Sequence, residues 1–220
     1  MTNTLTAPRT ADTLARLFAA ATAQEAAAAA DGYSAGHARD LSARERADAL
    51  QDAYMPVSAE GGNLLYALTR AARPQTVVEF GTSFGISTIF LAAGVIDNGA
   101  GHVFSTELSA AKVRAARDNL RQSGVDGPVT VLAGDARETL ADVPGPIGLV
   151  LLDGWKDLYL PVLRLLEPKL APGALVIGDD SSFPSVADYL AYVRDPAHGY
   201  VTVSFPVEDG MEISSWTGGH

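Results

Sequence analysis

The sequence contains no cysteine among its 220 residues. This absence excludes disulfides and thiolate metal sites, so a bound metal ion would need oxygen or imidazole ligands. Imidazole is scarce as well, because the four histidines are scattered along the chain and we assign none of them to a metal. They are His37, His102, His198 and His220.

Positive charge is also in short supply. Sixteen Lys and Arg residues against 26 Asp and Glu residues give a formal net charge of -10, and the basic residues form no cluster. Sequence-independent binding to the phosphate backbone of a nucleic acid requires a basic surface, so we expect no nucleic-acid partner.

The sequence has no basic N-terminal region followed by an apolar core, and its longest Ala-rich run carries Gln24 and Glu25. We therefore expect neither a signal peptide nor a membrane span, no membrane partner, and a cytoplasmic location.

Short apolar runs alternate with helical patterns from residue 77 onward, and the hydrophobic content of 47% is enough for one core. Strands are expected at 77–80, 103–107, 129–133, 148–153 and 174–179, and helices at 85–96, 109–122, 135–141, 160–170 and 185–194. Continuous apolar strands that are each followed by a helix indicate an α/β fold with a parallel sheet covered on both faces. Residues 200–206 and 211–216, with Asp209-Gly210 between them, predict an antiparallel hairpin at the end of a seven-stranded sheet.

Three helical patterns precede the first strand, at about 10–30, 41–53 and 58–72, and Ser58 resembles the N-cap of the third. We expect residues 1–55 to be a helical cap that belongs to the same domain as residues 56–220. The Ala-rich first helix is compatible with covering an active site, with pairing to a second subunit in a homodimer, or with both.

The carboxyl end of the first expected strand carries Gly81 and Gly85 immediately before a helix. Glycine lets the backbone approach a ligand, and a helix N-terminus offers free N–H groups to an anion. A dinucleotide fingerprint would have glycine at position 83 and a third glycine after it, and both are missing, which disfavours a pyrophosphate site. A tight turn with no ligand is the alternative reading.

Two further strand ends suit a nucleoside. Glu107 ends the second strand, where an acid can accept hydrogen bonds from both ribose hydroxyls, although a helix-start acid would look the same. After the third strand, Asp135-Ala136 would lie where an adenine ring binds, unless Asp135 is only an N-cap.

Three carboxylates follow the fourth and fifth strands: Asp153, Asp179 and Asp180. Neighbouring strands lie about 4.8 Å apart, so these charges should meet and repel one another unless a cation offsets them. A hard divalent ion such as Mg²⁺ would resolve the conflict. The alternative is that Asp179 and Asp180 only solvate a loop or cap the next helix.

Lys156 and Trp155 lie beside these acids. We expect desolvation and a nearby metal ion to lower the pKa of Lys156 toward the range of a general base, although the lysine could instead be a plain ion-pair partner. Trp155 offers a flat wall to a ligand ring, or is a partly buried core aromatic.

Together these residues form recognisable motifs. Glu79-x-Gly-x-x-x-Gly, Glu107 and Asp-Gly-Trp-Lys-Asp-Leu-Tyr-Leu-Pro at 153–161 resemble the S-adenosylmethionine-dependent, cation-dependent O-methyltransferases of the catechol and caffeoyl-CoA group. The likeness covers roughly residues 52–216. It implies a Rossmann-like class I methyltransferase fold and transfer of a methyl group to a hydroxyl of a small aromatic molecule with vicinal hydroxyls.

The resemblance also implies roles for individual residues. Lys156 would accept the proton of the attacking hydroxyl, and Asp153, Asp179 and Asp180 would hold Mg²⁺ or another divalent cation. The residues implied to line the S-adenosylmethionine site are Met55, Val57, Glu79, Gly81, Ser87, Glu107, Ala136, Asp153 and Trp155.

Three positions depart from the family pattern. Asp180 stands where the family usually has asparagine, Val203 where the catechol enzyme has an acid for the second substrate hydroxyl, and Gly154 where a bulkier residue flanks the adenine. The substrate and the site of methylation therefore stay open. The alternatives are a metal-independent methyltransferase or, with less support, a nicotinamide-dependent oxidoreductase.

Overall fold

The structure is a computed structural model that describes residues 3–30 and 41–218. Its centre is a seven-stranded sheet with the order β3-β2-β1-β4-β5-β7-β6. β7 runs antiparallel to β5 and β6, and the other pairings are parallel, which confirms the expected sheet with its C-terminal hairpin. The strands are β1 Thr76–Phe80, β2 His102–Glu107, β3 Val129–Ala133, β4 Ile147–Leu152, β5 Leu170–Gly178, β6 Tyr200–Phe205 and β7 Met211–Trp216.

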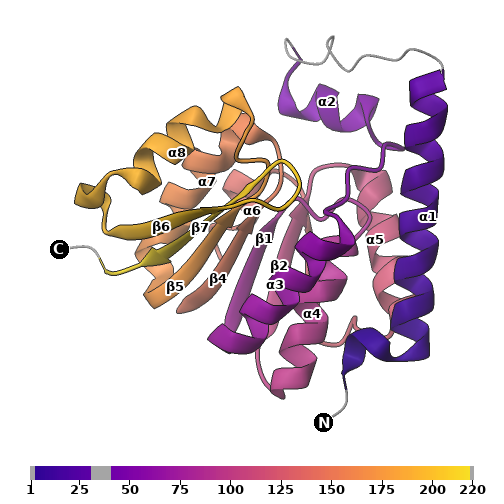
Figure 1. Ribbon diagram of the computed structural model, residues 1–220, viewed down its shortest axis with the longest axis horizontal. Coiled ribbons are helices and arrows are strands. Elements are labelled where there is room, and N and C mark those ends of the chain that lie inside the picture. The colour runs from indigo at the N-terminus through magenta and orange to yellow at the C-terminus, as the bar shows by residue number, and fades with distance from the viewer. Residues whose placement is uncertain (1–2, 31–40, 219–220) are drawn as a thin grey trace.

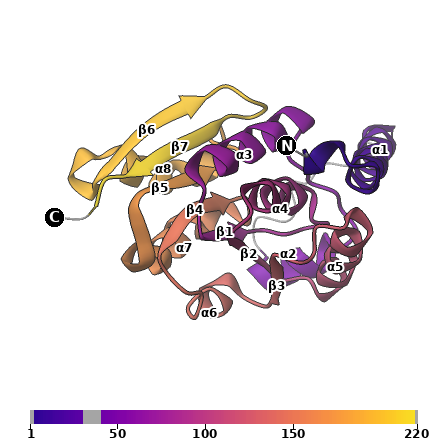
Figure 2. The ribbon, with the colours of Figure 1, turned by 90° about the horizontal axis from the view of Figure 1, so that it is seen from below.

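The helices lie on both faces of the sheet (Figures 1 and 2). One core, with Leu65, Ile89 and Leu120, lies under α3, α4 and α5, and a second, with Leu140 and Leu163, lies under α6, α7 and α8. The helices are α1 Pro8–Ala30, α2 Ala43–Ala49, α3 Ala59–Ala72, α4 Ile86–Asn98, α5 Ala110–Ser123, α6 Ala136–Thr139, α7 Tyr159–Leu166 and α8 Ala187–Arg194.

Two helices are shorter in the structure than the sequence patterns predict. The pattern at 41–53 yields only α2, and no helix or strand is assigned from Leu50 to Ser58. The pattern at 160–170 ends as α7 at Leu166 and continues in a 3-10 turn that contains Pro168. The N-cap expected at Ser58 is confirmed, since its hydroxyl accepts a hydrogen bond from the Gly61 N–H at 3.0 Å.

Helix α1 lies along α5 at the edge of the molecule (Figure 1). The Arg9 guanidinium donates to the carbonyl of Arg121 at 2.7 Å, and the Thr10 hydroxyl donates to that of Ser123 at 3.0 Å. Both carbonyls belong to the last turn of α5, where helical carbonyls lack partners within the helix. The division of the chain at residue 55 stays a prediction.

Further along α1, Gln24 holds the chain between α2 and α3. Its amide nitrogen donates to the carbonyl of Asp52 at 2.7 Å, and its amide oxygen accepts from the Tyr54 N–H at 2.6 Å. The segment that follows, from Tyr54 to Val57, is thereby anchored where it crosses the carboxyl edge of the sheet. In the described parts of the chain, no helix is both long and apolar enough to cross a lipid bilayer.

Candidate active site

The loops after β1 and β4 touch at the carboxyl edge of the sheet. Gly81 has a φ of 108°, and a Cβ there would lie 2.7 Å from the carbonyl carbon of Asp153 and 2.8 Å from the N of Gly154. Only glycine tolerates both this conformation and this approach. The two loops therefore lie in direct backbone contact, with no side chain between them.

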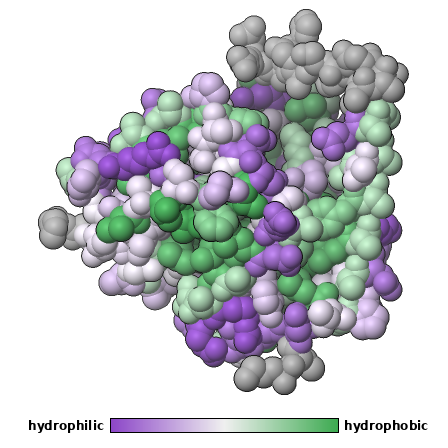
Figure 3. Space-filling view, in the orientation of Figure 1, coloured by the Kyte–Doolittle hydropathy of each residue, from purple (hydrophilic) through white to green (hydrophobic). Residues whose placement is uncertain are grey.

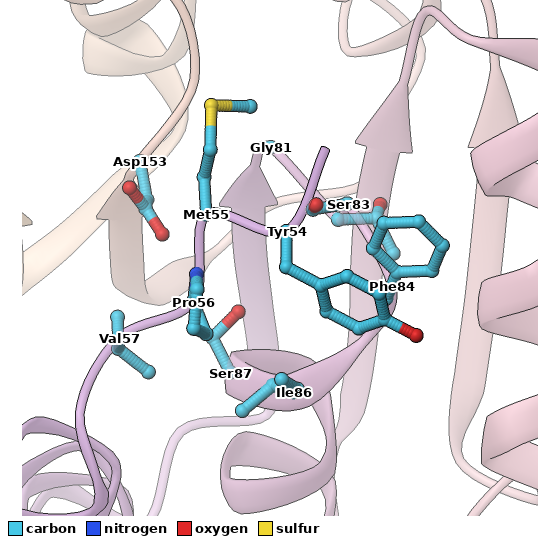
Figure 4. A pocket seen from close by; sticks show the side chains of 11 residues that line it. Tyr54, Met55, Pro56, Val57, Gly81, Ser83, Phe84, Ile86, Ser87 and Asp153 are labelled. Carbon is cyan, nitrogen blue, oxygen red and sulfur yellow. The ribbon is translucent and has the colours of Figure 1, made fainter. Parts of the chain in front are cut away.

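A pocket opens beside this contact and is covered by the segment from Tyr54 to Val57 (Figure 4). The cavity measures about 10 Å³. Sites for small ligands usually measure about 300–1,000 Å³, so this cavity by itself is too small to hold a whole nucleoside. The lining residues are Tyr54, Met55, Pro56, Val57, Gly81, Thr82, Ser83, Phe84, Ile86, Ser87 and Asp153.

Five of the residues proposed from the sequence therefore meet at one pocket: Met55, Val57, Gly81, Ser87 and Asp153. Sequence reasoning missed Tyr54 and Phe84, whose rings stack at 4.1 Å with an interplanar angle of 10° (Figure 4). The signal that could have found them is that Tyr54 precedes Met55, which was assigned to the site, and Phe84 precedes Gly85 of the glycine motif.

Glu79 lies behind the pocket rather than in its wall. Its carboxylate is completely buried in β1 and accepts hydrogen bonds from Ser87 at 2.6 Å, from Thr88 at 2.5 Å and from Ser105. Burial raises the pKa of Glu79, and the three hydroxyl donors oppose the shift. In this structure, Glu79 orients the first turn of α4, including Ser87, which lines the pocket.

Glu107 ends β2 as expected and is half-buried. Its two carboxylate oxygens accept hydrogen bonds from the backbone N–H groups of Ser83 and Ser109, each at 2.8 Å. Ser83 has a left-handed φ of 46°, so the carboxylate holds the strained part of the loop after β1.

The two residues proposed for the adenine end, Ala136 and Trp155, lie outside the lining of this pocket. Ala136 is buried and begins α6, and Asp135 is the N-cap of that helix, since it accepts from the Arg137 N–H at 2.9 Å. Trp155 is half-buried, with the guanidinium carbon of Arg46 4.8 Å from its ring centroid. Arg46 also pairs with Asp157 at 2.9 Å, so α2 is docked on the loop after β4.

The three carboxylates do converge. Asp153, Asp179 and Asp180 each offer an oxygen, and these oxygens lie within 4.8 Å of one another. Burial raises the pKa of Asp153 well above its usual value, and burial together with the Asp180 charge raises the pKa of Asp179 to about 6. Asp179 Oδ1 is buried and has no hydrogen-bond partner in the described parts of the chain. A buried acceptor without a donor, among charges of the same sign, fits a cation.

Lys156 faces this cluster. Its Nζ lies 2.7 Å from Asp180 Oδ2 and 3.5 Å from Asp153 Oδ1, and it donates a hydrogen bond to the Tyr159 hydroxyl at 2.7 Å. Burial acts to lower the pKa of Lys156, but the Asp153 and Asp180 carboxylates outweigh it and the pKa is raised. Without a cation, the acids that would bind the ion stabilise the ammonium and keep the pKa of Lys156 raised. The lowered pKa that we expect from burial together with a nearby metal ion stays a prediction.

The space beside Gly154 is filled by another residue. A Cβ at position 154 would lie 2.6 and 2.7 Å from the Phe80 ring carbons Cε2 and Cε1, and closer still to Cζ. The bulk that the family places at position 154 is thus replaced by an aromatic ring from the end of β1, which the sequence alone did not indicate.

The remaining residues considered from the sequence lie away from the acids. His102 begins β2, and its Nε2 is 2.8 Å from the Thr130 hydroxyl, while His198 Nδ1 is 2.9 Å from the carbonyl of Tyr192. His37 and His220 lie outside the described residues. Val203 is 57% exposed on β6, the edge strand.

A model of a known protein family, described as a methyltransferase domain, matches residues 78–181. Catechol O-methyltransferase B of Danio rerio is 30% identical over 178 residues, which cover 74% of this chain and 66% of that protein. Catechol O-methyltransferase of Mycobacterium tuberculosis is 33% identical over 134 residues, or 60% of each chain. The alignments thus span about 60 to 66% of the length of these curated relatives.

Solved structures share the fold. Cofactor-bound Rv0187 from MTB is 26% identical with a TM-score of 0.68, and the match covers 81% of this chain and 91% of that one. TomG from Streptomyces achromogenes, an O-methyltransferase solved in complex with SAM, is 23% identical with a TM-score of 0.65, covering 82% and 92%. These matches confirm the Rossmann-like methyltransferase fold.

The matched methyltransferase domain contains the end of β1, the loop after it, the Glu107 strand and all three acids. The motifs at 79–85, 107 and 153–161 therefore lie within the matched methyltransferase domain. The chain thus carries a methyltransferase domain, and it is similar to the S-adenosylmethionine-dependent O-methyltransferases of the catechol and caffeoyl-CoA type.

Proposed function

We propose that the protein transfers the methyl group of S-adenosylmethionine to one hydroxyl of a small catechol-type aromatic molecule, with a divalent cation, Mg²⁺ in the first instance, held at the acid cluster. The observation that carries the proposal is the convergence of Asp153, Asp179 and Asp180 with Lys156 beside the pocket of Gly81 and Ser87. Membership of the methyltransferase family supports the methyl donor over a nicotinamide dinucleotide.

The chain's own residues account for binding the donor. The first turn of α4 at Ser87 offers free backbone N–H groups to a carboxylate, and Glu79 fixes the orientation of this turn by accepting the Ser87 hydroxyl proton. Glu107 lies where ribose hydroxyls would replace its present backbone donors or add to them. Met55 and Val57 line the same pocket as Ser87, where their apolar side chains would shield the bound donor from water.

Two exposed apolar side chains favour an aromatic acceptor. Met55 is 48% exposed and lines the pocket together with Asp153, and Phe183 is 40% exposed in a turn whose N–H donates to the carbonyl of Asp180 at 3.0 Å. A catechol has oxygens that suit the acids and a flat ring that suits these apolar neighbours.

The residues also account for the proton. A bound divalent cation supplies positive charge that stabilises the anionic form of an acceptor hydroxyl, and it would be held by Asp153, Asp179 and Asp180. The carboxylates that raise the pKa of Lys156 would be neutralised in part with a cation bound, and the Lys156 amine would then be available as a base. Lys156 Nζ takes the proton of the hydroxyl while that oxygen bonds to the methyl carbon and the carbon–sulfur bond breaks with its electrons on sulfur.

The test is a transfer assay with caffeic acid and S-adenosylmethionine, with Mg²⁺ or excess EDTA, read by mass spectrometry as one added methyl group. We expect product with Mg²⁺ and none with EDTA. Lys156→Ala should lower turnover by about 100-fold or more, as removing a general base does. Asp179→Asn should lower turnover at a given Mg²⁺ concentration, because one of the three carboxylates proposed to hold the cation is lost. Asp126→Asn, at the opposite edge of the sheet, should not.

Other results would point elsewhere. Full activity in EDTA would refute the cation and favour the metal-independent methyltransferase. Unchanged turnover in Lys156→Ala would exclude this lysine as the base. No transfer to any of a panel of catechols would refute the acceptor class.

A further inference from the structure

The hydroxyl of Tyr159 is the one polar neighbour of Lys156 Nζ that is not a carboxylate of the acid cluster, among the described residues. Lys156 begins a short 3-10 turn and Tyr159 begins α7, so their three-residue spacing places both side chains on the same face of one continuous turn. The hydrogen bond from Nζ to Oη measures 2.7 Å, as short as the contact with Asp180.

Tyr159 is held in place from all sides. It is completely buried, and its ring packs edge-on against Phe80 at 6.3 Å and against Tyr189 at 5.6 Å. Its hydroxyl also donates to the backbone carbonyl of Asp179 at 3.3 Å. Because that proton is committed to a carbonyl, the oxygen can only accept from Lys156.

A hydrogen bond donated by Lys156 to Tyr159 restricts the orientation of the amine. A neutral lysine has two N–H groups and one lone pair, and the lone pair takes the proton of the acceptor hydroxyl. If Tyr159 occupies one N–H, rotation about the last carbon–nitrogen bond of the lysine is restricted, and the lone pair is limited to the two remaining positions on the nitrogen. The carboxylates of Asp153 and Asp180 are less suited to this role, since they are the groups proposed to hold the cation.

We propose that Tyr159 is a positioning residue for Lys156: its buried hydroxyl fixes the amine at the distance and direction at which it takes the proton of the acceptor. The inference rests on the proposed function for its kinetic consequence, but the contact itself can be tested without any transfer activity.

Tyr159→Phe removes the hydroxyl and keeps the ring that packs on Phe80 and Tyr189. We expect kcat with caffeic acid and Mg²⁺ to fall about tenfold, as for the loss of a buried hydrogen bond. The dissociation constant of S-adenosylmethionine should stay within about twofold, because Tyr159 does not line the donor pocket. The matched control is Tyr189→Phe, an equally buried tyrosine whose hydroxyl has no hydrogen-bond partner within the described residues.

A double-mutant comparison separates positioning from a general structural role. In a Lys156→Ala background, adding Tyr159→Phe should change the residual kcat by less than about twofold, because a residue that acts through Lys156 has nothing left to position. An equal loss in both backgrounds would overturn the proposal, as would a wild-type kcat in Tyr159→Phe or the same loss in Tyr189→Phe.

An activity-free measurement keeps the inference distinct from the proposed function. Acetic anhydride labels lysine amines, and the extent of labelling at Lys156 can be read by peptide mass spectrometry and normalised to Lys169. We expect Lys156 to be labelled about threefold faster or more in Tyr159→Phe than in Tyr189→Phe, because only the first variant removes a hydrogen-bond partner of the Lys156 amine. Equal labelling would refute the contact even in an active enzyme. Faster labelling in a protein that methylates nothing would support the contact and reject the proposed function alone.

Discussion

The fit between Phe80 and Gly154 gives a quantitative prediction for Gly154→Ala. The new methyl group would lie 2.6 and 2.7 Å from two Phe80 ring carbons, well inside contact distance. The ring cannot swing away freely, because it is 6% exposed and packs edge-on against the buried Tyr159. Overfilling a packed core costs about 1–3 kcal/mol of unfolding free energy. Gly154 has no left-handed φ, so the backbone adds no strain of that kind.

The opposing effect is smaller. Replacing glycine with alanine reduces the entropy of the unfolded chain and returns about 0.4–1 kcal/mol. The net loss is therefore about 1–2 kcal/mol, which lowers Tm by about 2–8 °C in a chain of this size. Differential scanning calorimetry and urea unfolding of Gly154→Ala measure both values.

Phe80→Leu tests whether the Phe80 ring is what excludes a side chain at position 154. Phe80→Leu alone should cost about 1 kcal/mol through lost packing, but it frees the space that the methyl group needs. The double variant should thus be more stable than the sum of the two single losses by about 1–2 kcal/mol. If the losses add within about 0.5 kcal/mol, the two positions do not interact and the contact is not the reason for glycine at 154.

Two further predictions concern the acid cluster. Burial and the Asp180 charge raise the pKa of Asp179 to about 6. In EDTA, the folded protein therefore binds a proton at Asp179 more tightly than the unfolded chain does, and the ionised Asp179 carboxylate destabilises the fold above about pH 6. Asp179→Asn should be more stable than wild type by up to about 3 kcal/mol at pH 7.5, the difference vanishing toward pH 4; a constant difference in urea unfolding would contradict the shift. Adding Mg²⁺ at 100 times its dissociation constant should stabilise wild type by about 2.7 kcal/mol, seen as a rise in Tm, and should do the same for Asp126→Asn but not for Asp179→Asn. An equal rise in all three would place the ion elsewhere.

The fold was accessible from the sequence because its signals are local. Continuous apolar strands, each followed by a helix, predict a parallel sheet, and the Asp209-Gly210 turn predicts the hairpin. Helix ends were less accessible, since the pattern at 41–53 has the periodicity of a helix but only Ala43–Ala49 forms one. The chain beyond follows Gln24 of α1, and this tertiary contact leaves no local pattern.

The candidate site divides in the same way. Asp153 and Asp179 could be brought together in advance because adjacent parallel strands end at one edge. The charge state of Lys156 could not be predicted from the sequence, because it depends on its burial and on its distances to three carboxylates. The stack of Tyr54 on Phe84 and the ring of Phe80 against Gly154 join residues about 30 and 74 positions apart, and no spacing rule encodes such contacts.

The contact at Gly81 also constrains how this site can be dissected by mutagenesis. Any side chain at position 81 would push on the backbone of Asp153, so Gly81→Ala would damage the donor loop and the acid loop together, whatever the role of the glycine toward a ligand. A loss of activity in that variant could not be assigned to either partner of the reaction. Ser87 and Asp180 can be mutated to test the two sides separately. Ser87 lies in the first turn of α4, Asp180 lies in the loop after β5, and neither lies at the contact between Gly81 and Asp153.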